Sequence, residues 1–109
     1  MSEVRLVMTT FGSESEAKTV VRELLERKLI ACVNLIPQAV SLYRWEGKVC
    51  EEAEVVVFLK TVTTHYSALE AALQELHSYD VPEIVALELT AGSERYFNFV
   101  RENTDLLQS

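Results

Sequence analysis

The sequence is poor in the residues that interrupt regular structure and lacks the common motifs that bind metals or phosphates. Its 109 residues include three isolated glycines and two prolines, so a Gly-rich phosphate loop is excluded and disorder is not expected. No apolar run approaches the ~20 residues of a membrane helix, so no membrane partner is expected. Cys-x-x-Cys, His-x-x-x-His and Gly-x-Ser-x-Gly spacings are all missing. The sequence therefore indicates neither a preformed zinc site nor a nucleophilic enzyme.

Basic residues are also scarce, with ten Lys and Arg against 17 Asp and Glu, for a net charge of −7. Most of the excess lies in residues 62–109, which hold two basic and eight acidic side chains. Nucleic-acid binding depends on Lys and Arg that displace counterions from phosphates, so nucleic acid is not expected as a partner. An acidic surface can attract cations, although the same charge more often serves ordinary solubility.

Residues 29–61 contain two extended runs, rich in β-branched and aromatic residues, on either side of a predicted turn at Glu46-Gly47. Each run has about 14 residues and would span ~45 Å as a strand. The longest predicted helix covers only ~22 Å. Much of this hairpin therefore cannot be covered by its own subunit. We expect Leu42, Tyr43 and Trp45 to pack against another copy of the chain.

The same hairpin separates the two cysteines, Cys32 and Cys50. Its register places Cys50 opposite Tyr43 and Cys32 opposite Thr61, ~35 Å away, whereas a disulfide requires Cα atoms within ~7 Å. Two free thiols are typical of a reducing compartment, and the first residues, MSEVRLVMTT, lack the features of a signal peptide. The sequence therefore predicts a cytoplasmic protein without an internal disulfide.

Hydrophobic periodicity predicts further strands at about 4–10 and 84–89, and helices at about 13–28, 64–77 and 92–103. Ser13 and Glu16 form a predicted capping box at the start of the first helix, and Pro37 predicts a bulge or an edge segment in the first arm of the hairpin. The order β-α-β-β-α-β with an extra C-terminal helix is typical of an α+β, ferredoxin-like domain.

Residues 55–59 read Val-Val-Val-Phe-Leu, so both faces of this strand are apolar. Both faces are therefore predicted to be buried. A two-layer monomer buries only one face of its sheet, so this pattern, like the length of the hairpin, predicts an oligomer.

The sequence resembles the CutA divalent-cation tolerance family. The resemblance is carried by ACVN at 31–34, SLYRWEGK at 41–48, Lys60-Thr61 and HSYDVPEI at 77–84, and it extends in order from about Val4 to Asn103. It implies a single CutA-like domain over residues 1–109 and a compact homotrimer similar to the PII signalling proteins. It also implies a non-enzymatic role in tolerance and binding of copper or another divalent cation, with no organic cofactor indicated.

Two positions depart from the usual pattern of that family. Ser78 stands where the family commonly has proline, and this change is expected to loosen the turn that leads to Tyr79. Phe99 replaces a tryptophan in the last helix, so the packing of that helix is expected to differ.

Cys32 and His77 are the candidate metal ligands. A thiol is a soft ligand that suits Cu(I), although a free cysteine in a strand more often acts as a small core hydrophobe. His77 closes the second helix, where a histidine also interacts favourably with the helix dipole, so a structural role is the common alternative. His65, at the start of that helix, is a weaker candidate, and Cys50 is interpreted as structural.

In CutA-like proteins a cleft lies between neighbouring subunits. The positions here that match motif residues near it are Cys32, Trp45, Glu54, Lys60, Tyr79 and Glu83. Charged residues beside buried runs are usually paired or face a cleft, so an ion pair from Lys60 to Glu54 or Glu83, within one chain or across subunits, is the structural alternative. The second functional hypothesis is a PII-like signalling module whose cleft binds a small metabolite, such as an anion held by Lys60 and oriented by Tyr79 and Glu83.

Overall fold

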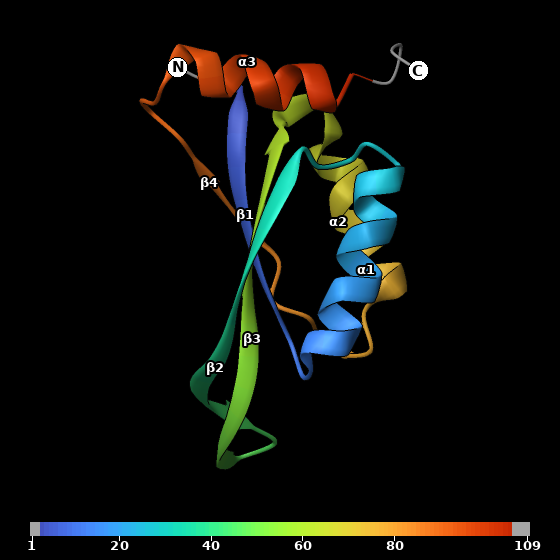
Figure 1. Cartoon of the computed structure of the whole chain (residues 1–109). Helices are drawn as coiled ribbons and strands as arrows, with labels where there is room; N and C mark the ends of the chain where they lie inside the picture. The colour runs from blue at the N-terminus through green and yellow to red at the C-terminus, as the bar shows by residue number, and fades with distance from the viewer. Residues whose placement is uncertain (1–2, 106–109) are drawn as a thin grey trace.

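The computed structural model of the protein describes residues 3–105. These residues form one four-stranded antiparallel sheet with the strand order β2-β3-β1-β4, together with three α-helices (Figure 1). The strands are β1 Val4–Phe11, β2 Cys32–Trp45, β3 Lys48–Val62 and β4 Val85–Glu88. The helices are α1 Glu14–Glu26, α2 Tyr66–Leu76 and α3 Glu94–Asn103, and a 3-10 turn, Thr63–His65, leads into α2. The predicted α+β, ferredoxin-like element order and the C-terminal helix are confirmed.

Helices α1 and α2 lie side by side on one face of the sheet (Figure 1). The core between them and the sheet is built from fully buried aliphatic and aromatic side chains, including Val7, Phe11, Leu24, Val57, Leu59, Leu69 and Leu73. Burial of each such side chain contributes about 1.5–3 kcal/mol. Leu25 of α1, by contrast, is partly exposed. None of the helices in the described part of the chain is both long and apolar enough to cross a bilayer.

The predicted capping box at the start of α1 is half present. The Ser13 hydroxyl accepts a hydrogen bond from the Glu16 amide at 3.1 Å, which satisfies one of the free N–H groups of the first turn. The Glu16 carboxylate does not accept the second capping-box hydrogen bond, from the Ser13 amide. It accepts bonds from both the amide and the hydroxyl of Ser78, each at 3.0 Å. Proline has no amide hydrogen, so Ser78 ties the turn before Tyr79 to α1, contrary to the expected loosening.

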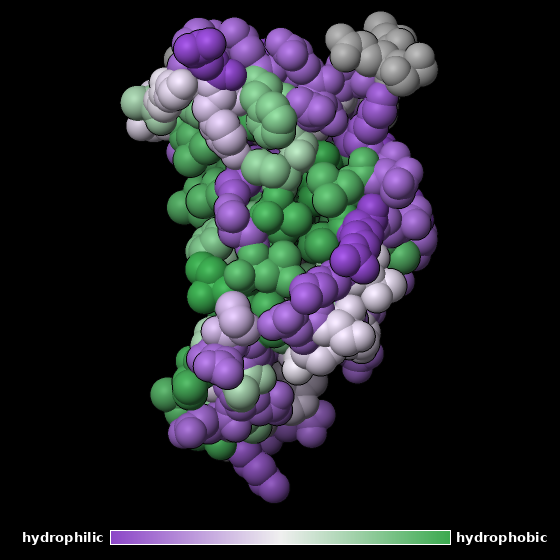
Figure 2. All heavy atoms as spheres, in the orientation of Figure 1, coloured by the Kyte–Doolittle hydropathy of each residue, from purple (hydrophilic) through white to green (hydrophobic). Residues whose placement is uncertain are grey.

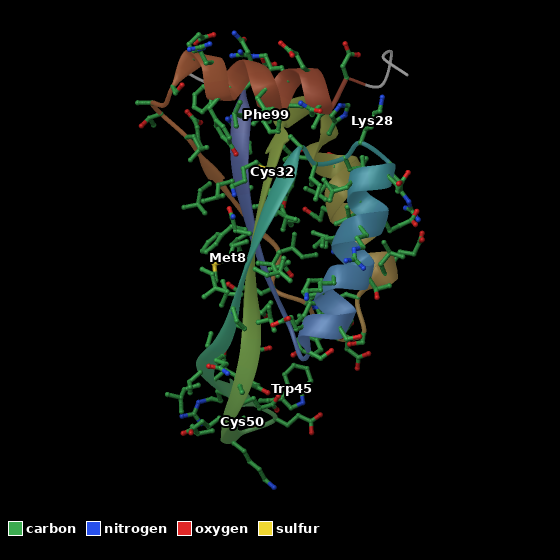
Figure 3. All side chains as sticks on the ribbon, viewed as in Figure 1. Met8, Lys28, Cys32, Trp45, Cys50 and Phe99 are labelled. Carbon is green, nitrogen blue, oxygen red and sulfur yellow. The ribbon has the colours of Figure 1, made fainter. Side chains whose placement is uncertain are left out.

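The hairpin closes at Glu46-Gly47, where both residues have positive φ, and it pairs Tyr43 with Cys50 as predicted. The register shifts by one residue between Ile36 and Ala39, around Pro37 and Gln38. Cys32 consequently faces Lys60 and not Thr61. Figure 3 shows the two cysteines near opposite ends of the hairpin, and both are free thiols.

Helix α3 covers only one end of the second face of the sheet, where Val4, Val62, Phe97 and Val100 form a small buried cluster. Farther along the same face, the side chains are half-buried or exposed: Leu6, Met8, Ile36, Val56, Phe58, Val85 and Leu87. Figure 2 shows hydrophobic residues at the surface along the sheet, in contrast with the hydrophilic outer side of α3. The second face of β3 is therefore apolar, as predicted, but a single chain does not bury it.

Candidate functional site

A groove of about 580 Å³ lies between the distal half of the hairpin and residues 79–83, which follow α2. We call it the hairpin groove, and its lining residues are Thr10, Ser41, Leu42, Tyr43, Trp45, Cys50, Glu52, Glu54, Tyr79, Asp80, Val81 and Glu83. Alternation along the β2–β3 ladder places Tyr43, Cys50, Glu52 and Glu54 on one face. The groove thus brings together four of the six positions predicted near the cleft, without Cys32 and Lys60, and all three predicted interface residues.

Glu54 is the buried acid of the hairpin groove, with only 9% of its surface exposed. The Tyr79 hydroxyl donates a hydrogen bond of 2.6 Å to Glu54 Oε2. Burial, and then this hydrogen bond, raise the pKa of Tyr79 well above its ordinary value, because ionisation would place two negative charges side by side. The phenol therefore remains a donor to the carboxylate throughout the neutral range.

His77 positions Tyr79. Its Nε2 lies 2.6 Å from the carbonyl oxygen of Thr10, and its Nδ1 accepts the Tyr79 amide at 3.1 Å. Since a carbonyl cannot donate and an amide cannot accept, this network assigns a neutral ring with its proton on Nε2. The ring also stacks on Phe11 with centroids 4.3 Å apart and planes 6° apart. To bind a metal, His77 would have to give up one of its two backbone contacts.

A second hydrogen-bonded pair lies nearer the hairpin tip. The Tyr43 hydroxyl donates to Glu52 Oε1 at 2.8 Å. This hydrogen bond is the main reason why the pKa of Tyr43 is raised to about 12. The lining includes Glu52, Glu54, Asp80 and Glu83 but no Lys or Arg, so the groove is a site of negative potential.

Lys60 lies outside the hairpin groove. It pairs with Cys32 of β2 and Leu6 of β1, and its ammonium donates to Asn34 Oδ1. It is six positions from Glu54 along β3, or about 20 Å. Within the described residues of one chain Lys60 forms no ion pair with Glu54 or Glu83, and the pairing across subunits stays a prediction.

Cys32 lies on the sheet face that α3 partly covers, and its Sγ is 2.9 Å from the Tyr96 hydroxyl of that helix. Burial and this contact raise the pKa of Tyr96 to about 12. Cys32 lies in the same row across the sheet as Leu6 of β1. His77 contacts Thr10, which is four residues farther along β1. The two candidate metal ligands are therefore separated by about 13 Å along the strand direction. Across residues 3–105, no three His, Cys, Asp or Glu side chains gather in a way that could hold a metal ion.

The weaker histidine candidate, His65, also contacts the backbone, since its Nε2 lies 2.6 Å from the Thr104 carbonyl oxygen. Sequence reasoning missed Glu52, Asp80 and Tyr96. Strand alternation was an available signal for Glu52, which is two residues from Glu54. No local pattern links Tyr96 to Cys32 across 64 residues.

Comparisons with known proteins agree on one family. A family model described as CutA1 divalent ion tolerance protein matches residues 5–103. The divalent-cation tolerance protein CutA of Thermus thermophilus is 43% identical over 104 residues, which cover 95% of this chain and 99% of that protein. Protein CutA of Homo sapiens is 38% identical over 102 residues, and the match covers 94% of this chain but 57% of the human protein. The crystal structure of CutA from Xylella fastidiosa has a TM-score of 0.93 at 34% identity, covering 95% and 100% of the two chains.

Proposed function

The chain belongs to the CutA1 divalent ion tolerance protein family, and from this premise we propose that it is a cytoplasmic, non-enzymatic homotrimer that binds copper. The family is named for tolerance and not for a reaction. Two free thiols support a reducing location. The uncovered apolar face of the sheet is the observation that carries the proposal of assembly, because surfaces of this kind usually mark protein–protein contacts.

The assembly would cover two groups of exposed apolar side chains. The first is the middle of the second sheet face, with Ile36, Val85 and Leu87. The second is the distal hairpin, where Leu42, Tyr43 and Trp45 remain partly or largely exposed. Strands β2 and β4 are both at sheet edges, and an edge strand has unpaired backbone groups available to a neighbouring chain.

Copper binding in this proposal requires ligands from more than one subunit. Cys32 supplies a soft thiolate donor, and it lies beside α3 on the partly covered sheet face that we assign to the interface. One chain offers no group of three suitable side chains within its described residues, so neighbouring copies would complete the coordination. His77 is the second predicted ligand, and its participation would require the Tyr79 loop to move.

Native mass spectrometry of the freshly purified, reduced protein tests assembly and copper binding in one experiment. We expect a trimer that gains copper on titration with Cu(I). Cys32→Ser should remain trimeric and lose the added copper mass, whereas the matched control Cys50→Ser should retain it. A monomer would contradict the proposed assembly. Equal copper uptake by Cys32→Ser and the unmodified protein would contradict the assigned ligand.

The second candidate function is a PII-like signalling module that binds a small metabolite between subunits. The hairpin groove favours it, because Trp45, Glu54, Tyr79 and Glu83 all line one cavity. Lys60 is not in that cavity, so the anion-binding version of this hypothesis loses its basic residue within a single chain. Two results would favour this candidate over copper binding. The first is a trimer that retains an organic adduct, and the second is a Cys32→Ser variant that still binds metal weakly at surface carboxylates.

A further inference from the structure

The charges of the hairpin groove are unbalanced. Glu54 is nine-tenths buried, and the only hydrogen bond of its carboxylate within residues 3–105 is the one that Oε2 accepts from Tyr79. No basic side chain of the described chain forms an ion pair with it, and Oε1 has no hydrogen-bond donor there. Thr9 Oγ1 is the sole side-chain oxygen or nitrogen of the described residues that is both fully buried and without a partner, so the unpaired Oε1 of Glu54 is open to the groove. This site therefore favours a ligand that brings positive charge and a hydrogen-bond donor.

Acidic side chains occupy both walls of the groove. Glu52 and Glu54 come from β3, and Asp80 and Glu83 come from the segment after α2. Their separation excludes the tight cluster of oxygens that a single inorganic cation requires, since no three of the described acids gather in such an arrangement. Four carboxylates without a Lys or Arg in the lining also disfavour an anion. A ligand with positive charges at separate positions matches this arrangement.

The surface between the carboxylates is largely apolar and aromatic. Leu42 and Val81 supply aliphatic contacts, and Tyr43 and Trp45 supply rings. Methylene groups pack well on such surfaces, and an ammonium group over a Tyr or Trp ring gains a cation–π interaction of roughly 0.5–2 kcal/mol. Figure 3 shows Trp45 on the distal hairpin, beyond the part that the helices cover.

We propose that the hairpin groove binds a linear aliphatic polyamine, with one ammonium group at Glu54 and Glu52 and another at Asp80 and Glu83. The methylene chain lies along Trp45 between them. This proposal rests on the cleft-binding candidate described above and replaces its anionic ligand with a cationic one.

The state of the two tyrosines is consistent with this ligand. The hydrogen bond to Glu52 raises the pKa of Tyr43 to about 12, and burial, followed by the hydrogen bond to Glu54, raises the pKa of Tyr79. Both phenols are therefore protonated at neutral pH, and both donate to the acids. Each acid keeps an oxygen that could accept from an ammonium group.

The test is a fluorescence titration of the full-length protein, in its own assembly state, with spermidine. Trp45 is the only tryptophan in the chain, so indole emission reports on the groove directly. We expect a saturable change in emission at constant ionic strength. Equal concentrations of 1,8-octanediol, which has the chain without the charges, and of Mg²⁺, which has charge without the chain, should not reproduce it.

Neighbouring acidic residues of β3 provide matched variants. Glu52 and Glu54 line the groove, whereas Glu51 does not and alternates to the other face of the ladder. We expect Glu54→Gln to weaken spermidine binding at least 10-fold and Glu52→Gln about threefold. Glu51→Gln, which changes the net charge equally, should remain within twofold. If Glu54→Gln fails to fold by circular dichroism, Glu52→Gln and Glu83→Gln still test the site.

The polyamine proposal is wrong if spermidine does not bind, if Mg²⁺ gives the same change, or if Glu51→Gln weakens binding as much as Glu52→Gln. Native mass spectrometry separates this result from the proposed assembly. A trimer that does not bind spermidine would contradict only the polyamine proposal. A monomer that binds spermidine with the expected variant pattern would contradict only the trimer.

Discussion

The two halves of the β2–β3 hairpin have similar apolar side chains but very different surroundings. In the proximal half, Val57 and Leu59 are fully buried beneath α1 and α2. In the distal half, Val40 and Leu42 are each 65% exposed, and Trp45 is 47% exposed. The distal half projects beyond the rest of the molecule, as Figure 1 shows.

This difference separates the residues that fold one chain from those available to join several. Burial of the proximal side chains is already complete within the monomer, so these residues contribute to its stability. The distal side chains bury little apolar surface when one chain folds, so most of their hydrophobic stabilisation remains available on association. Changes in the two halves should therefore affect different measurements.

The largest expected effect on folding comes from Leu59→Ala. Leu59 is fully buried in the main core, and such a truncation costs about 2–5 kcal/mol in the free energy of unfolding. Urea unfolding at a fixed protein concentration measures the loss. Val40→Ala, in the exposed half, is the matched control and should change the free energy of unfolding by less than about 0.5 kcal/mol under conditions where the protein is monomeric. Similar losses in the two variants would remove the distinction between the halves.

Trp45→Ala should have a smaller effect on the monomer but a decisive effect on assembly. A central aromatic residue often contributes about 2 kcal/mol or more to an interface, so the variant should dissociate at concentrations where the unmodified protein is trimeric. Its far-UV circular dichroism should remain unchanged. Native mass spectrometry and sedimentation measure the dissociation, and Leu25→Ala, at a partly exposed apolar residue of α1, should assemble normally. A Trp45→Ala trimer with unchanged melting would refute the interface role.

Local patterns in the sequence predicted much of this fold. Glu46-Gly47 marks the hairpin turn because the chain reverses there with positive φ at both residues. Ser13 caps α1, and alternation along residues 55–59 distinguishes the two sheet faces. The approximate position of the bulge also followed from Pro37, but its size could not, since the conformation of Gln38 depends on how the two strands pair.

The candidate site was only partly predictable because its contacts join distant segments. Glu54 and Tyr79 are 25 residues apart, and Glu16 and Ser78 are 62 apart. Composition and periodicity do not specify such pairs. A single chain does not bring Lys60 to the hairpin groove, since it lies about 20 Å from Glu54 along β3, and its place in a cleft between subunits stays a prediction.

The smallest expected effect, and the sharpest probe of the distal half alone, is the alkaline pH dependence of Tyr43. Its pKa is raised from 10.0 to about 12, chiefly by the hydrogen bond to Glu52. Since the phenol ionises more readily in the unfolded chain, the bond contributes its full stability below about pH 10 and loses it as the pH rises through 12. Tyr43→Phe should flatten the decline in stability over this range and remove one phenol from the absorbance titration near pH 12.

Glu52→Gln provides the control for this assignment, because it keeps the phenol but removes the carboxylate that perturbs it. In that variant the pKa of Tyr43 should fall back toward 10, and the alkaline loss of stability should again be flatter than in the unmodified protein. Tyr79 and Tyr96 also have raised pKa values, so only the difference between variant and unmodified protein reports on Tyr43. An unchanged pH profile in both variants would show that the hydrogen bond to Glu52 does not persist in solution. The distal hairpin would then be less ordered than the half that the helices cover.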